Sequence, residues 1–121
     1  SQPGRCGARP SQGAALNTQP QTSHYSGTIT LNEGGTGSID RDVCVSITGD
    51  NAVFYYTSGT TTSSGTGTVS SGVSFTAGFW DYQVVFSNLN QNSVTIDMNG
   101  TFGANTRTGS TDLNITTTPC S

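Results

Sequence analysis

Residues 93–102, SVTIDMNGTF, alternate apolar and polar side chains almost without a break. Successive side chains of an extended chain point to opposite faces, so a period of two predicts a β-strand with one buried face. The face that we expect to be buried carries Val94, Ile96, Met98 and Phe102, and the opposite face is polar.

The same alternation recurs in short segments on both sides of this stretch. These segments are residues 25–31 (YSGTITL), 38–49 (SIDRDVCVSITG), 52–58 (AVFYYTS), 73–78 (VSFTAG), 80–89 (WDYQVVFSNL) and 108–118 (TGSTDLNITTT). Turns rich in Gly and Asn connect them, and no segment has the i, i+3, i+4 spacing of an amphipathic helix. We therefore predict an all-β fold of about eight short antiparallel strands, which form a β-sandwich or a small up-and-down β-barrel.

The alternation also assigns an orientation to individual side chains. Arg41 shares the inward register of Ile39 and Val43, close to the start of its strand. In the last segment, Leu113 and Ile115 are expected to point inward.

Two segments lack a clear alternation. Residues 57–72, TSGTTTSSGTGTVSSG, are low in complexity, and we expect one strand near residues 66–70 with loop on either side. Residues 1–23 contain three of the four prolines and no apolar periodicity. They predict an irregular N-terminal arm in front of a single all-β domain at residues 24–121.

The composition excludes some classes of partner. Charged residues make up 9% of the chain, the net charge is -3, and the four basic residues are dispersed arginines. Without a basic stripe for phosphate groups, nucleic acid is not an expected partner. No apolar run approaches the ~18 residues of a membrane span. The N-terminal sequence SQPGRCGARPSQ has no apolar signal region, so we expect any signal peptide to have been removed already.

The three cysteines, Cys6, Cys44 and Cys120, fit no zinc-binding spacing. They predict one intramolecular disulfide and one thiol that is available for an intermolecular bridge. All three pairings are open, and the alternative is three reduced thiols in a cytosolic protein. We favour Cys44–Cys120, because Cys44 falls on an outward strand face where an arm or a tail would have to cover it.

Two sequons point in the same direction as the cysteines. Asn99-Gly100-Thr101 and Asn114-Ile115-Thr116 are acceptor sequences for N-glycosylation, and both asparagines fall on outward faces. We therefore predict a secreted or cell-surface protein that carries at least one disulfide and can be a glycoprotein.

No group of residues resembles a catalytic centre, so we predict that the protein is not an enzyme and uses no cofactor. The only histidine, His24, lies where the arm meets the first strand, and the only glutamate, Glu33, lies in a Gly-rich turn. Asp40, Asp42 and Asp50 are oxygen ligands of the kind that calcium takes, but no EF-hand-like loop surrounds them. No metal site is predicted.

The aromatic residues are the best candidates for ligand binding. Around residues 54–56 and 79–82 there are more aromatic side chains than one buried face can take. Exposed Trp and Tyr rings can stack on sugars. The candidate ligand-binding residues are Tyr55, Tyr56, Trp80 and Tyr82, and the alternative is that they fill the core.

Three functions are consistent with these features. The first is a non-enzymatic subunit of an extracellular filament, pilus, sheath or other surface assembly, which associates with itself or another surface protein by strand or arm exchange and by an intermolecular disulfide. The second is a secreted module that binds a carbohydrate or another small ligand through exposed aromatic residues. The third is a secreted inhibitor of an enzyme.

Overall fold

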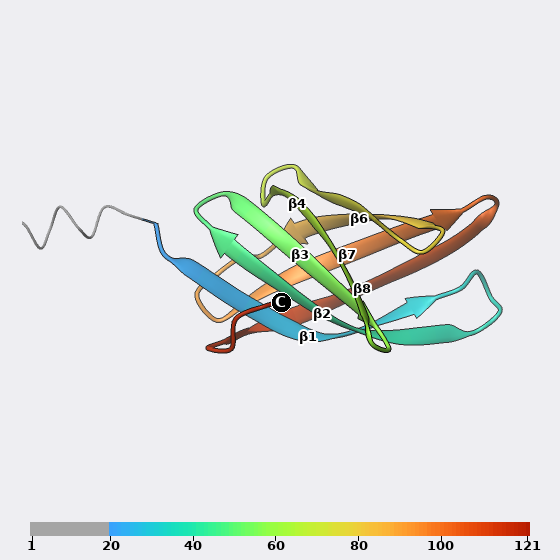
Figure 1. The fold of residues 1–121 in the computed structure, drawn as a ribbon, viewed down its shortest axis with the longest axis horizontal. Helices are drawn as coiled ribbons and strands as arrows, with labels where there is room; N and C mark the ends of the chain where they lie inside the picture. The colour runs from blue at the N-terminus through green and yellow to red at the C-terminus, as the bar shows by residue number, and fades with distance from the viewer. Residues whose placement is uncertain (1–19) are drawn as a thin grey trace, which may run out of the picture.

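A computed structural model describes residues 20–121, and the regular secondary structure in this range is β-strand. The strands are β1 (Thr22–Asn32), β2 (Ser38–Thr48), β3 (Asn51–Ser58), β4 (Thr61–Thr68), β5 (Gly72–Ala77), β6 (Trp80–Ser87), β7 (Ser93–Phe102) and β8 (Asn105–Thr116). Each strand pairs antiparallel with the next, and β8 pairs with β1, which closes the sheet into a barrel (Figure 1). The all-β fold is confirmed, and the barrel replaces the sandwich alternative. The predicted arm lies almost entirely outside the described residues.

The core fills the inside of the barrel with the alternate side chains of the strands. It consists of Tyr25, Ile29, Leu31, Val43, Val45, Ile47, Ala52, Phe54, Tyr56, Val73, Phe75, Tyr82, Val84, Phe86, Val94, Ile96, Met98 and Leu113. An eight-stranded barrel has an interior just wide enough for its own side chains to fill. Two residues differ from the predicted inward orientation: Phe102 and Ile115 lie near strand ends, where the wall no longer encloses them, and both are exposed.

The low-complexity segment forms a strand earlier than predicted. Residues 66–70 were expected to be the strand, whereas β4 spans Thr61–Thr68 and pairs with β3 over its whole length. A Cβ on Gly67 would overlap the carbonyl of Gly72, so a glycine is needed for β5 to approach this closely. β4 has no apolar side chains, and it is held in the sheet by close backbone contacts. Hydrophobic periodicity therefore does not reveal its bounds.

The wall is unevenly sealed between β4 and β5. Their ladder contains only Gly67↔Val73 and Thr68↔Gly72, whereas β5 and β6 pair from Val73↔Val84 to Ala77↔Trp80. The β4–β5 ladder therefore ends well before the end of the barrel at which the β3–β4 turn lies.

A disulfide joins Cys44 of β2 to Cys120 and fastens the C-terminal tail to the outside of the wall. The predicted outward orientation of Cys44 explains this bond. The third cysteine, Cys6, lies outside the described residues. Within residues 20–121 there is no helix of the length and apolar character needed to cross a membrane.

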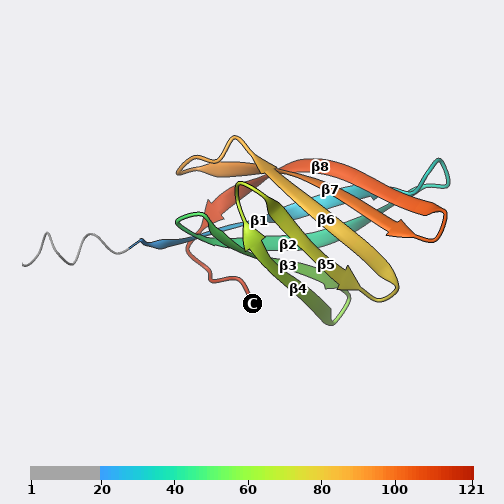
Figure 2. The same ribbon diagram turned by 90° about the horizontal axis from the view of Figure 1, so that it is seen from above.

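The four turns that join β1–β2, β3–β4, β5–β6 and β7–β8 lie at one end of the barrel, toward the right in Figures 1 and 2. We call this end the mouth. The β2–β3, β4–β5 and β6–β7 turns lie at the opposite end.

Candidate functional site

The interior changes from apolar to polar at the mouth. Arg107 of β8 donates through Nε to Glu33 Oε2 at 2.7 Å and through Nη1 to the Tyr82 hydroxyl at 2.8 Å. The Tyr82 hydroxyl lies 3.0 Å from that of Tyr56. A chain of hydrogen bonds thus runs from the β1–β2 turn through β8 and β6 to β3, and it satisfies polar atoms that would be costly to bury alone.

Tyr82 is positioned by the glycine that pairs with it. Gly100 of β7 lies between Tyr82 of β6 and Arg107 of β8 in the ladder. A Cβ on Gly100 would lie 2.5 Å from Tyr82 Cε1, so the ring occupies the space that any larger residue would fill. Burial, the largest cause, and the hydrogen bond with Tyr56 raise the pKa of Tyr82 to about 12, although Arg107 acts to lower it. The phenol is therefore neutral at physiological pH.

Arg107 also supports the largest aromatic side chain of the mouth. Its guanidinium carbon lies 3.9 Å from the centroid of the Trp80 ring, a cation–π contact. Burial acts to lower the pKa of Arg107, but its hydrogen bonds to Tyr82 and Glu33 outweigh burial and raise that pKa. The guanidinium is thus a permanent charge that fixes Trp80, Tyr82 and Glu33 in relation to one another.

An aromatic cluster, Phe79, Trp80 and Phe102, forms the surface of the mouth beside the β5–β6 and β7–β8 turns. Phe79 is 82% exposed and Phe102 is 46% exposed. Their rings are stacked with centroids 5.7 Å apart, and Trp80 meets Phe102 edge-on at 5.8 Å. The two exposed rings thus form one contiguous apolar patch at the mouth.

Two cavities lie on either side of Trp80. The first, about 570 Å³, is lined by Glu33, Gly34, Thr36, Trp80, Phe102, Ala104, Asn105 and Thr106. The second, about 370 Å³, is lined by Arg41, Tyr56, Ser58, Thr61, Ser63, Ala77, Gly78, Phe79, Trp80 and Arg107. We call the second cavity the seam pocket, because it opens where the β4–β5 ladder has ended. Both are within the usual size of small-ligand sites, roughly 300–1,000 Å³.

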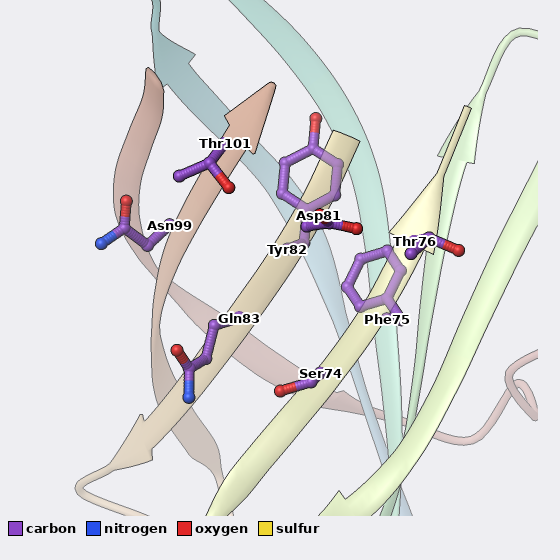
Figure 3. A pocket seen from close by; sticks show the side chains of 8 residues that line it. All are labelled: Ser74, Phe75, Thr76, Asp81, Tyr82, Gln83, Asn99 and Thr101. Carbon is purple, nitrogen blue, oxygen red and sulfur yellow. The ribbon is translucent and has the colours of Figure 1, made fainter. Parts of the chain in front are cut away.

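A different hollow lies on the outer wall. It measures about 450 Å³, and the side chains labelled in Figure 3 come from the neighbouring strands β5, β6 and β7. Its polar lining consists of Ser74, Thr76, Asp81, Gln83, Asn99 and Thr101. The aromatic residues at this place, Phe75 and Tyr82, are buried in the core and stack on each other, so they offer no ring face to a ligand there.

The structure brings three of the four predicted ligand-binding residues together. Trp80, Tyr82 and Tyr56 lie at the mouth. The Tyr82 ring is stacked on Trp80 with centroids 6.2 Å apart, and it is tilted against Tyr56 with centroids 4.9 Å apart. Tyr56 and Tyr82 are buried and therefore support the site from below. Tyr55 lies elsewhere, because it pairs with Cys44 and lines a hollow on the outer wall with Ser121.

The other residues singled out in the sequence have separate places. His24 Nδ1 lies 2.8 Å from the Ser46 hydroxyl and 3.5 Å from the Cys120 backbone nitrogen, so His24 helps to hold the C-terminal tail. Asn99 and Asn114, the sequon asparagines, are both exposed. Among the described residues, no three His, Cys, Asp or Glu side chains come together as a metal site would require.

Sequence reasoning missed the charged residues of the mouth, Glu33, Arg41 and Arg107. A signal was present, since Arg41 and Arg107 both occupy inward positions near a strand end. A charge at such a position indicates the rim of a barrel, where the core ends and solvent begins. Glu33 appeared only as a turn residue, because nothing in its local sequence indicates the partner 74 residues away.

The fold and the mouth define a closed antiparallel barrel with a polar, aromatic-rimmed opening. No family model matches the chain, and no curated protein or solved structure is significantly similar to it.

Proposed function

We propose that the protein is a secreted binding module and that it holds a saccharide at the mouth of the barrel. The observation that carries this proposal is the aromatic cluster, in which Phe102 lines the larger cavity, Phe79 lines the seam pocket, and the two exposed rings stack on each other. Aromatic rings bind the apolar faces of sugars, and nearby hydroxyl and amide groups bind the sugar hydroxyls. Thr36 and Asn105 supply such groups in the larger cavity.

The central ring of the cluster, Trp80, is already fixed before a ligand arrives. Arg107 holds Trp80 from one side, and Glu33 and Tyr82 hold Arg107. Trp80 therefore has little side-chain freedom left to lose when a ligand arrives, which favours affinity. The Cys44–Cys120 disulfide is compatible with a secreted protein, since such bonds persist in oxidising compartments.

The test is binding to a broad glycan array, followed by titration calorimetry with the glycans that are retained. We expect Phe79→Ser to abolish or strongly weaken binding. The matched control is Val85→Ser, which removes an apolar side chain that is 52% exposed on the outer wall. Absence of any retained glycan, or equal binding by wild type and Phe79→Ser, would contradict the proposal.

A second candidate is the subunit of an extracellular assembly, and the cysteine count favours it. Because Cys44 and Cys120 are bonded to each other, Cys6 is the one cysteine of this sequence that remains to form a bridge to another molecule. In this barrel the wall leaves strand edge unpaired between β4 and β5, where the ladder ends early, and the ladders between the other neighbouring strands extend over most of their length. A disulfide is therefore a simpler link than an exchanged strand. Non-reducing electrophoresis should then show a dimer that disappears in Cys6→Ser; a wild-type monomer under oxidising conditions would rule out this link.

A further inference from the structure

The seam pocket concentrates positive charge in a part of the chain that is otherwise acidic. Residues 20–121 contain seven acidic side chains and two arginines, Arg41 and Arg107, and no lysine. Both arginines line the seam pocket, and none of the acidic residues does. Both cations therefore lie at one cavity, where positive charge can attract a negatively charged group.

The two arginines differ in how far their charges are already compensated. Arg107 forms an ion pair with Glu33 at 2.7 Å. Arg41 has no ion pair among the described residues, and its Nη1 donates to the backbone carbonyl of Asp40 at 2.9 Å. Arg41 is therefore the charge that is available to a ligand.

The acidic residues next to Arg41 in the chain face the other way. Asp40 accepts a hydrogen bond from the Thr30 hydroxyl at 2.7 Å, and Asp42 accepts one from the Thr28 hydroxyl at 3.1 Å. Both carboxylates are thus on the outer wall, on the side of β2 opposite to Arg41. The wall separates these negative charges from the pocket.

Arg41 also contains a donor that the protein does not satisfy. Its Nε is buried and has no hydrogen-bond partner among the described residues. Leaving a buried donor without a partner is costly, so groups of this kind are commonly explained by a ligand, ion or water that completes them. An oxygen that reached the Nε edge of the guanidinium would remove this cost.

The rest of the pocket suits an oxyanion that is attached to a ring. Ser58, Thr61 and Ser63 bring hydroxyl groups, which can donate to anionic oxygens. Phe79 and Trp80 belong both to the aromatic cluster and to this pocket. A ring that stacks on the cluster can therefore place a substituent directly in the seam pocket.

We propose that the saccharide bound at the mouth is an acidic one and that Arg41 receives its carboxylate or sulfate group in the seam pocket. This inference rests on the proposed binding function and adds the chemical class of the ligand. A guanidinium binds a planar carboxylate or a sulfate through paired hydrogen bonds.

The experiment compares pairs of ligands that differ only in the anion. Titration calorimetry on the full chain would use oligogalacturonate against its methyl ester, and dextran sulfate against dextran. We expect one acidic ligand to bind about tenfold more tightly than its neutral partner, because one charge-assisted hydrogen bond contributes an affinity difference of about this size. Preference in the first pair identifies a carboxylate, and preference in the second identifies a sulfate.

Variants of Arg41 test the assignment of the residue. Arg41→Gln should reduce the ratio of acidic to neutral affinity to about one, because it removes the charge that distinguishes the two ligands. Arg41→Lys should recover part of the preference, because it restores the charge without the paired geometry. Gln83→Glu, on the outer wall, changes the net charge by the same amount as Arg41→Gln and should change neither affinity beyond about twofold. Thermal unfolding and near-UV circular dichroism would establish that each variant is folded.

Three failures can be told apart. Equal affinity for the acidic and neutral ligands, unaltered by Arg41→Gln but abolished by Phe79→Ser, would overturn the role of the anion and keep the binding function. Absence of binding by all four ligands and by every other glycan of the array would overturn both proposals. Equal weakening of acidic and neutral ligands by Arg41→Gln and Arg41→Lys would show that Arg41 acts only on the shape of the mouth.

Discussion

The middle of the barrel and its mouth follow the same strand alternation, yet they are filled with different chemistry. In the middle, inward positions carry apolar residues such as Val45, Phe54 and Ile96, which are fully buried. One or two positions further toward the mouth, the same register carries Arg41 and Arg107. The alternation determines only whether a side chain points inward or outward. Whether an inward side chain must be apolar or can be charged depends on how far the residue lies from the end of its strand. Stability should therefore reside in the middle and binding at the mouth.

Among the substitutions that test the division between a stabilising middle and a binding mouth, Phe54→Ala is expected to have the largest effect on the free energy of unfolding. Phe54 is fully buried and packs against Phe75 and Phe86 at centroid distances of 5.7 and 6.5 Å. Removing a buried ring leaves a cavity and costs about 3–5 kcal/mol of the free energy of unfolding. Denaturant unfolding followed by fluorescence measures the loss, and the fraction that stays folded should bind ligand with wild-type affinity.

Phe54→Leu is the matched control, because it keeps an apolar side chain at the site and should cost less than Phe54→Ala. A loss below about 1 kcal/mol for Phe54→Ala would mean that the middle of the barrel does not carry the stability that its burial implies.

The second effect, removal of the disulfide, also acts on stability alone. Cys44 and Cys120 are separated by 76 residues, so their bond removes much of the freedom of the unfolded chain. We expect the double substitution Cys44→Ser with Cys120→Ser to cost about 2–4 kcal/mol. The comparison is made by thermal unfolding of the double variant and of the wild type with and without reductant.

Reduction of the double variant should change nothing further, which controls for effects of the reductant itself. Because Cys44 lies on the outer wall, binding at the mouth should be unchanged at temperatures where the variant is folded. A loss of affinity without a loss of stability would place the C-terminal tail in the ligand site.

The sequence allowed the middle of the barrel to be predicted far better than the mouth. Alternation gave the inward residues of β2, β6 and β7 because each inward position there carries a visibly apolar side chain, apart from Arg41 and Gly100. It did not give the inward face of β3, because that strand carries large apolar side chains on both faces. The choice between barrel and sandwich could not be predicted, since closure depends on β8 meeting β1, a pairing with no local signal. The mouth depends on contacts such as Arg107 with Glu33 and Trp80, which bring together residues from distant strands.

A third and smaller effect concerns the ionisation of Tyr82, where the middle and the mouth meet. Its pKa is raised to about 12 in the folded protein, against the ordinary 10.0 of the unfolded chain. The unfolded chain thus loses this proton first. The stabilising contribution of the neutral phenol is present in full below about pH 10 and is lost as the pH rises through about 12.

The free energy of unfolding of wild type and Tyr82→Phe, measured between about pH 9 and 12, tests whether the wild type loses stability as the pH rises. This range covers the ordinary and the raised pKa of Tyr82. As the pH rises through this range, the free energy of unfolding of the wild type should fall relative to that of Tyr82→Phe. Tyr55→Phe, on the outer wall, is the control for general alkaline effects. Parallel curves for wild type and Tyr82→Phe would contradict the raised pKa.

The smallest effect on stability should come from the residue with the largest proposed effect on binding. Phe79 is 82% exposed and contacts Phe102 only through stacked rings at the surface. Phe79→Ser should therefore change the free energy of unfolding by no more than about 0.5 kcal/mol, as is usual for surface positions. If the same variant loses the ligand, the separation between a stabilising middle and a binding mouth is established at a single side chain. If Phe79→Ser instead destabilises the protein by as much as Phe54→Ala does, the aromatic cluster is an extension of the core, and its exposure would no longer support a ligand.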